Sequence, residues 1–172
     1  MPLRGERPHS NPVNGLSGVP ALALFVKGVP APQGSKTAVT IGGAARVIEG
    51  GSSTGRKKHK VWRATVTQAA KEAWNGRAAL DCPVGVELVF LMPRPTSAPK
   101  KRVWADTKPD IDKLERSILD SLKVAGVLIE DSRVVKVAKE KELTTGDTGV
   151  QITIFDLTNV MPSSYNDYAA LF

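Results

Sequence analysis

Two aspartates two positions apart, Asp110 and Asp112, stand in the segment "TKPDIDKLERS" of residues 107–117, just ahead of an expected helix. Pro109 favours an extended backbone at Lys108, and residues two apart on an extended segment project to the same side. Two ionised carboxylates about 5 Å apart repel by about 3 kcal/mol at an effective dielectric constant near 20. A divalent ion held through oxygen ligands, such as Mg²⁺ or Mn²⁺, would remove that repulsion. The pair is therefore a candidate metal site.

Helix capping is the alternative explanation for one member of the pair. Asp112 is expected at the N-cap of the helix, where an aspartate contributes about 1 kcal/mol without any other role. Capping leaves Asp110 unexplained, and a D-x-D pair alone is a weak signal. A third carboxylate, Asp131, follows the helix and its turn, and it reaches the pair only if the next strand folds back along the sheet. The residues alone leave capping and metal binding both open.

The elements that position these carboxylates are predicted from hydrophobic periodicity. Alternating apolar residues indicate strands, and apolar stripes at three- and four-residue spacing indicate helices. Strands are expected at 21–29, 37–41, 44–48, 84–92, 133–143 and 150–154, and helices at 60–74 and 112–124. Residues 49–55 and 93–107 are expected to be loops. The resulting βββαβαββ order predicts a mixed α/β (α+β) fold, with two helices packed on a mostly antiparallel sheet.

Length and composition favour one nucleic-acid-binding domain. The 172 residues suit a single domain, expected at 21–157 between a flexible N-terminal tail, 1–20, and a C-terminal tail, 158–172. The net charge of +7 favours a polyanionic partner such as nucleic acid. Cys82 is the only cysteine, which excludes an intramolecular disulfide and a cysteine zinc site and suits a reducing cytoplasm. The early apolar run, 19–26, is far shorter than the ~20 residues that span a membrane.

A long segment of the chain resembles a known signature. Residues 108–137, "KPDIDKLERSILDSLKVAGVLIEDSRVVKV", resemble the RusA-like Holliday-junction resolvases, the endodeoxyribonucleases of phages, prophages and bacteria. The match runs through the D-x-D pair, the helix ending "DSLKVAG" and the "EDSRVV" turn without a gap, and weaker similarity covers 22–157. The resemblance implies homodimers that bind four-way DNA junctions in recombination and repair. It also implies two opposing nicks, made by metal-dependent hydrolysis, that leave 5′-phosphate and 3′-hydroxyl ends.

The resemblance also implies roles for individual residues. Asp110, Asp112 and Asp131 match the three family aspartates that hold catalytic Mg²⁺, for which Mn²⁺ can substitute. The family often has a catalytic lysine four residues after the second aspartate, and here that position is Arg116. Arg116 shares a helix face with Asp112. Because arginine stays protonated, it is expected to hold a phosphate oxygen and stabilise the transition state rather than donate a proton. A solvated helix face is the alternative.

Basic segments around the aspartate motif are candidate contacts to the DNA backbone, because cationic side chains neutralise phosphates. The candidates are Lys36, Arg56, Lys57, Lys58, Lys60, Arg94, Lys100, Lys101, Arg102, Lys108 and Lys113. A solvated charge run is the alternative for each, and an acidic metal site nearby favours DNA contact. The C-terminal "YAALF" resembles a weak sliding-clamp-binding peptide without its usual glutamine, and a frayed end or a dimer contact is the alternative.

Three functions remain open from the sequence. The first is a metal-dependent endonuclease that resolves Holliday junctions, in a bacterial cytoplasm and encoded by the cell, a phage or a prophage. The second is a non-catalytic protein that binds four-way or branched DNA, which the three intact aspartates disfavour. The third is a nuclease for other branched or flap DNA, which the sequence does not separate from the first. None of them involves a membrane.

Overall fold

The regular elements follow one another in the predicted order, βββαβαββ. The computed structural model describes residues 16, 19–34, 36–49 and 52–162, with the backbone alone described at 36–41 and 45–49. The elements are β1 (Leu22–Lys27), β2 (Lys36–Ile41), β3 (Ala44–Glu49), α1 (Ser53–Trp74), β4 (Val84–Pro93), α2 (Ile111–Val124), β5 (Val134–Thr144) and β6 (Gly149–Asp156). A short 3₁₀ helix, η2 (Asp131–Arg133), immediately precedes β5.

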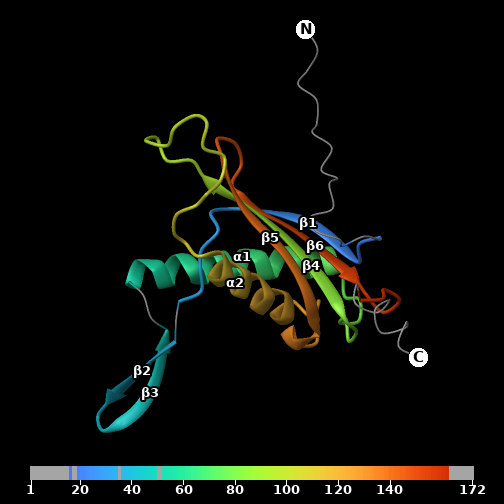
Figure 1. Cartoon of the computed structure of the whole chain (residues 1–172). Helices are drawn as coiled ribbons and strands as arrows, with labels where there is room; N and C mark the ends of the chain where they lie inside the picture. The colour runs from blue at the N-terminus through green and yellow to red at the C-terminus, as the bar shows by residue number, and fades with distance from the viewer. Residues whose placement is uncertain (1–15, 17–18, 35, 50–51, 163–172) are drawn as a thin grey trace, which may run out of the picture.

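Four strands form one mixed sheet in the order β1-β6-β4-β5, and β2 and β3 form a separate two-stranded ladder. β6 is antiparallel to both β1 and β4, whereas β4 and β5 are parallel. Figure 1 shows α1 and α2 on one face of the four-stranded sheet, with the β2–β3 hairpin projecting at the lower left. This arrangement confirms the predicted fold class, two helices on a mostly antiparallel sheet.

The parallel pairing of β4 and β5 decides where the aspartates lie. Parallel neighbours need a crossover connection, and α2 is that crossover. Val84 at the start of β4 pairs with Val134, and Pro93 at its end pairs with Thr144. The C-terminal end of β4 leads to α2, and the N-terminal end of β5 follows α2. Because the two strands are parallel, these ends lie at opposite ends of the strand pair. With a rise of about 3.3 Å per residue, the 11 residues of β5 separate the two ends of the strand pair by about 35 Å.

The core lies between the sheet and the two helices. Alternate residues of β4 and every fourth residue of α2 are fully buried: Val84, Val86, Leu88, Phe90, Leu114, Ile118 and Leu122. Burying a side chain of this kind contributes about 1.5–3 kcal/mol to stability. Because the buried stripe runs along the whole of α2, both ends of the helix are held against the sheet.

The start of α1 differs from the prediction. The helix begins at Ser53, whereas the apolar stripe predicts a start at residue 60 and a loop over 49–55. Ser52 caps it, because its Oγ accepts a hydrogen bond from the Gly55 N–H at 3.0 Å. The added turns carry polar and basic side chains, so no apolar periodicity marks them. The whole basic run "RKKHK", residues 56–60, therefore lies on a helix rather than at the end of a loop.

The start of α2 corrects a second prediction. Its N-cap is Asp110, not Asp112, and the Leu114 N–H donates to the Asp110 carbonyl at 3.2 Å. The extended backbone thus ends at Asp110, two residues earlier than the predicted N-cap at Asp112. The Asp110 side chain makes no capping hydrogen bond. Capping therefore does not occupy either carboxylate, since Asp112 lies inside the first turn.

The predicted tails, 1–20 and 158–172, fall mostly outside the described residues. Leu16 is 2% exposed and packs with Ala138 and Phe155, on the sheet face opposite the helices. In the part of the chain that the structure describes, no helix has the length and apolar character of a membrane span.

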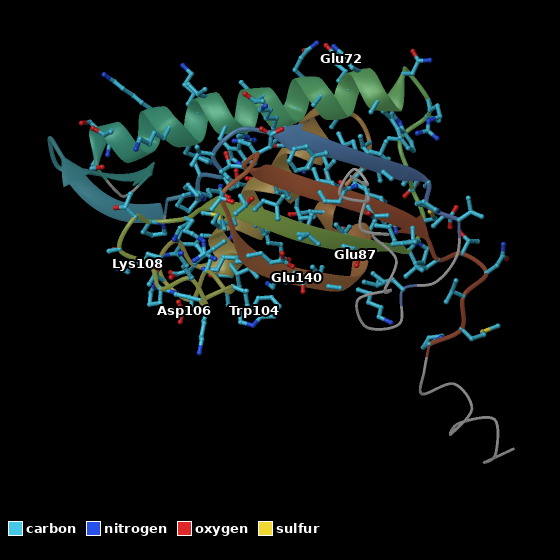
Figure 2. The ribbon with its side chains drawn as sticks, turned by 90° about the horizontal axis from the view of Figure 1, so that it is seen from above. Glu72, Glu87, Trp104, Asp106, Lys108 and Glu140 are labelled. Carbon is cyan, nitrogen blue, oxygen red and sulfur yellow. The ribbon has the colours of Figure 1, made fainter. Side chains whose placement is uncertain are left out.

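Three glutamates gather on this second face of the sheet. Glu87 alternates with core-facing Val86 and Leu88 on β4, and Glu140 and Glu142 lie on the neighbouring β5. Figure 2 labels Glu87 and Glu140. Partial burial raises the pKa of Glu140 above its ordinary value, and the charges of Glu142 and Glu87 raise it further. The ionised form of Glu140 therefore costs folding free energy.

Glu140→Gln is expected to stabilise the fold at pH 7 by about 0.5 kcal/mol, or about 1–2 °C in Tm. The pKa of Glu140 is higher in the folded than in the unfolded state, so ionisation destabilises the fold above the unfolded pKa and has no effect where both states are protonated. The gain should fade as the pH falls toward about 4. Thermal melts across this range test it. Glu72→Gln, on the exposed side of α1, is the control, and a gain at pH 4 equal to that at pH 7 contradicts the prediction.

Candidate functional site

A groove of about 1170 Å³ opens between the N-terminal half of α1, the segment 29–34 and the loop that joins β4 to α2. Its buried lining includes the apolar side chains of Ala31, Trp62, Met92 and Ala105 and one polar side chain, His59. Its charged lining is basic apart from one carboxylate, and consists of Arg56, Lys57, Lys58, Lys108, Lys113, Lys141 and Asp110. The groove thus combines one acidic group with a cationic surround, which suits a phosphate chain.

Asp110 stands at the junction of this groove and the start of α2. Its side chain is about half-exposed, and its Oδ2 lies 3.1 Å from the Lys113 Nζ. Lys113 is one turn further along α2, so the pair follows from the i,i+3 neighbourhood on a helix. Asp110 is therefore held near the groove by its own helix, with one oxygen facing a cation.

Asp112 lies in the first turn of α2 and is exposed. A carboxylate in this position is stabilised by the positive end of the helix dipole and by the unpaired N–H groups of the first turn. The structure thus places Asp110 and Asp112 within one turn at the same end of α2, beside the groove.

Asp131 lies at the other end of α2. It opens η2, which is fixed by ion pairs between Lys123 and Glu130 at 2.5 Å and between Arg133 and Asp81 at 2.5 Å. The hydrogen bond with Glu130 raises the pKa of Lys123, and the charge of Asp131 adds to this. The 14 residues of α2 extend over about 20 Å. Within a single chain, Asp131 therefore lies far from the aspartate pair.

The described residues of one chain do not bring the three predicted metal ligands together. Among the described residues, no three His, Cys, Asp or Glu side chains are close enough together to hold an ion. Asp110 and Asp112 offer oxygen ligands of the kind that Mg²⁺ prefers, and Mg²⁺ is often bound by only one or two carboxylates. The pair fits part of such a site, and the predicted third ligand lies elsewhere.

The basic position predicted to assist catalysis lies outside the groove lining. Arg116 is exposed on α2, and no described residue pairs with its guanidinium. Lys113, one turn earlier, both lines the groove and contacts Asp110. The cation nearest to Asp110 is thus Lys113 rather than Arg116.

The predicted DNA contacts differ in where they lie relative to the groove. Five of them line the groove: Arg56, Lys57, Lys58, Lys108 and Lys113. Lys60, Lys100 and Lys101 are exposed but do not line it, and the Lys36 side chain lies outside the description. The structure therefore brings part of the predicted basic surface together at Asp110.

Two of the predicted DNA contacts instead hold the loop between β4 and α2. Arg94 donates to the carbonyls of Pro99 and Arg102, at 3.0 and 2.5 Å, and Arg102 pairs with Asp106. These guanidinium groups are engaged within the protein. A structural role explains their contacts without DNA.

Lys141 is the groove residue that the sequence reasoning missed. It lies on β5, half-buried, and its Nζ donates to the carbonyls of Thr107 at 2.8 Å and Pro109 at 2.7 Å. Within the strand, Lys139 and Lys141 alternate with Glu140 and Glu142. That alternation places both lysines on the helix side of β5. It is the sequence feature from which Lys141 could have been predicted to face the helices.

The comparison with known proteins agrees with this geometry. The family model of endodeoxyribonuclease RusA matches residues 29–155, which include the groove lining, both helices and all three aspartates. No curated protein matches the chain. The motif at Asp110, its position at the mouth of a basic groove and the extent of the family match establish that the chain belongs to the RusA family of endodeoxyribonucleases, the Holliday-junction resolvases.

Proposed function

We propose that this chain resolves four-way DNA junctions by paired symmetric nicks that leave 5′-phosphate and 3′-hydroxyl ends, with Mg²⁺ as the cofactor and Mn²⁺ able to substitute. The observation that carries the proposal is the position of Asp110, the one carboxylate among the described residues that line a basic groove. A cationic groove holds the DNA strand through its phosphates. A carboxylate beside those phosphates would repel them unless a cation lay between.

Different residues of the chain have different roles in phosphodiester hydrolysis. Asp110 and Asp112 provide carboxylate oxygens, and the first turn of α2 provides free N–H groups that favour anions. Lys57, Lys108 and Lys113 bind and orient the strand along the groove. A divalent ion held by these carboxylates would supply a water of lowered pKa and would neutralise charge that develops on the phosphate. Arg116 has no other partner among the described residues. It is therefore available to bind a phosphate of the DNA strand where the strand extends beyond the groove.

The third carboxylate is proposed to come from a second copy of the chain. In one chain Asp131 and the aspartate pair lie at opposite ends of α2, so two copies packed in a two-fold arrangement would bring each pair beside the other copy's Asp131. Exposed apolar side chains lie within a few residues of Asp131 in the sequence: Val124, Ile129 and Val135 are 62%, 47% and 64% exposed. Burial against a second copy would remove this apolar surface from water.

Cleavage of a synthetic four-way junction tests the proposed function. The junction, a linear duplex and a flap are each incubated with the protein in Mg²⁺, in Mn²⁺ and in EDTA. Paired nicks that ligase can seal are expected on the junction with either metal and not in EDTA. Tight binding without cleavage would instead favour a non-catalytic junction-binding protein, and equal cleavage of the flap would favour a nuclease for branched DNA in general. The sliding-clamp contact stays a prediction, because the C-terminal residues lie outside the described part of the chain.

A further inference from the structure

β5 is attached to the start of α2 by two neighbouring lysines. Lys139 pairs with Glu115 of α2, and Lys141 Nζ donates to the carbonyls of Thr107 and Pro109, at 2.8 and 2.7 Å. The two lysines face the same side of the strand. They differ in what they hold, since Lys139 grips a helical side chain and Lys141 grips the backbone just before Asp110.

The loop that leads to Asp110 contacts both the backbone and the side chain of Lys141. The Lys141 carbonyl accepts from the Ala105 N–H at 3.1 Å, and its ammonium then holds residues 107 and 109. Charge-assisted hydrogen bonds are about twice as strong as neutral ones. Pro109 has no N–H, so its carbonyl is its only backbone polar group. Lys141 thus fixes the last peptide groups before the aspartate pair to a strand of the sheet.

The geometry points to Lys141 as a positioning residue for the nuclease site, a role that rests on the proposed function. Two of the three N–H donors of its ammonium are used by the loop, which leaves at most one for DNA. Lys108 and Lys113, in contrast, have donors to offer to the groove. Lys141 therefore acts through Asp110, because it holds the backbone just before this aspartate against β5.

The position of a catalytic group strongly affects the reaction rate, because a displacement of about 1 Å at a reacting centre can lower the rate about 100-fold. Without the ammonium, the carbonyls of Thr107 and Pro109 lose their partner, and the loop after Ala105 is released from β5. Asp110, which directly follows Pro109 at the junction of this loop and α2, would then sample several positions relative to the groove. DNA binding would change little, since the other cations that line the groove remain.

Lys141→Met and Lys139→Met form a matched pair, because each removes one lysine charge from the same face of β5. Lys141→Met is expected to lower the single-turnover cleavage rate of the bound junction about 100-fold. Its junction Kd in EDTA should stay within about threefold of the parent value. Lys139→Met should keep the rate within about threefold, and Lys141→Arg, which can still donate to two carbonyls, should recover most of the lost rate.

Hydrogen exchange of the free protein in EDTA tests the same inference without cleavage. Amides of residues 106–112 should exchange roughly tenfold faster in Lys141→Met than in Lys139→Met. Equal exchange in the two variants, an equal loss of rate in both, or a weakened Kd with an unchanged rate in the bound complex would overturn the positioning role. If the parent protein cuts no branched DNA, the proposed function fails, and the exchange data still decide whether Lys141 holds the loop.

Discussion

Asp112→Asn is expected to abolish junction cleavage, with a loss of at least about 10³-fold in rate, and to leave the junction bound as tightly or more tightly. A metal ion contributes several kcal/mol of transition-state stabilisation, and 1.4 kcal/mol corresponds to a tenfold rate change. The substitution removes a charged ligand and keeps the shape of the side chain. It also removes a negative charge that repels phosphate, which explains the unchanged or tighter binding. Single-turnover rates in Mg²⁺ and gel-shift titrations in EDTA measure the two effects separately.

Asp120→Asn is the matched control for this experiment. Asp120 lies on the same helix, eight residues beyond Asp112 and away from the groove lining. The same chemical change there should leave both rate and affinity near those of the parent. Cleavage by Asp112→Asn at the parent rate would remove Asp112 from the metal site, and equal losses in both variants would indicate a general defect of α2.

The elements with strong periodicity are predicted closely from the sequence. The predicted bounds of β4 and α2 agree with the structure to within one residue, because each presents an unbroken apolar face to one core. The first two turns of α1 are missed for the opposite reason. They are stabilised by the Ser52 cap and expose polar residues, so the apolar pattern begins only where the helix reaches the sheet.

The location of the candidate site residues is predicted only in part. Asp110 and Asp112 are two residues apart, so both lie at the start of α2 whatever the long-range fold. Asp131 depends on the parallel pairing of β4 and β5, a long-range property that periodicity does not report. The strand–helix–strand order around α2 was the available signal, since such units usually form parallel crossovers. Lys141 reaches Pro109 across 32 positions of sequence, and only the assembled sheet shows that contact.

The separation of Asp131 from the aspartate pair leads to a prediction for mixed dimers. Chains with Asp112→Asn and chains with Asp131→Asn, each inactive alone, are co-expressed with different tags, and the heterodimer is purified. If each site combines the pair of one copy with Asp131 of the other, the heterodimer has one intact site and one site with both defects. It should nick one strand at about half the parent rate for the first nick and leave the junction unresolved. Denaturing gels of end-labelled junction strands measure this directly.

A heterodimer of Asp110→Asn and Asp112→Asn chains provides the control, because both of its sites lack one member of a pair and neither should cut. The comparison separates two arrangements that single substitutions do not distinguish. If all three aspartates acted within one chain, both heterodimers would be inactive, since every copy carries a defect. Recovery in the first heterodimer alone requires that Asp131 serve the other copy's site. The roughly 20 Å length of α2 makes that recovery the expected result, because it holds the two groups apart in one chain and leaves a second copy to bring them together.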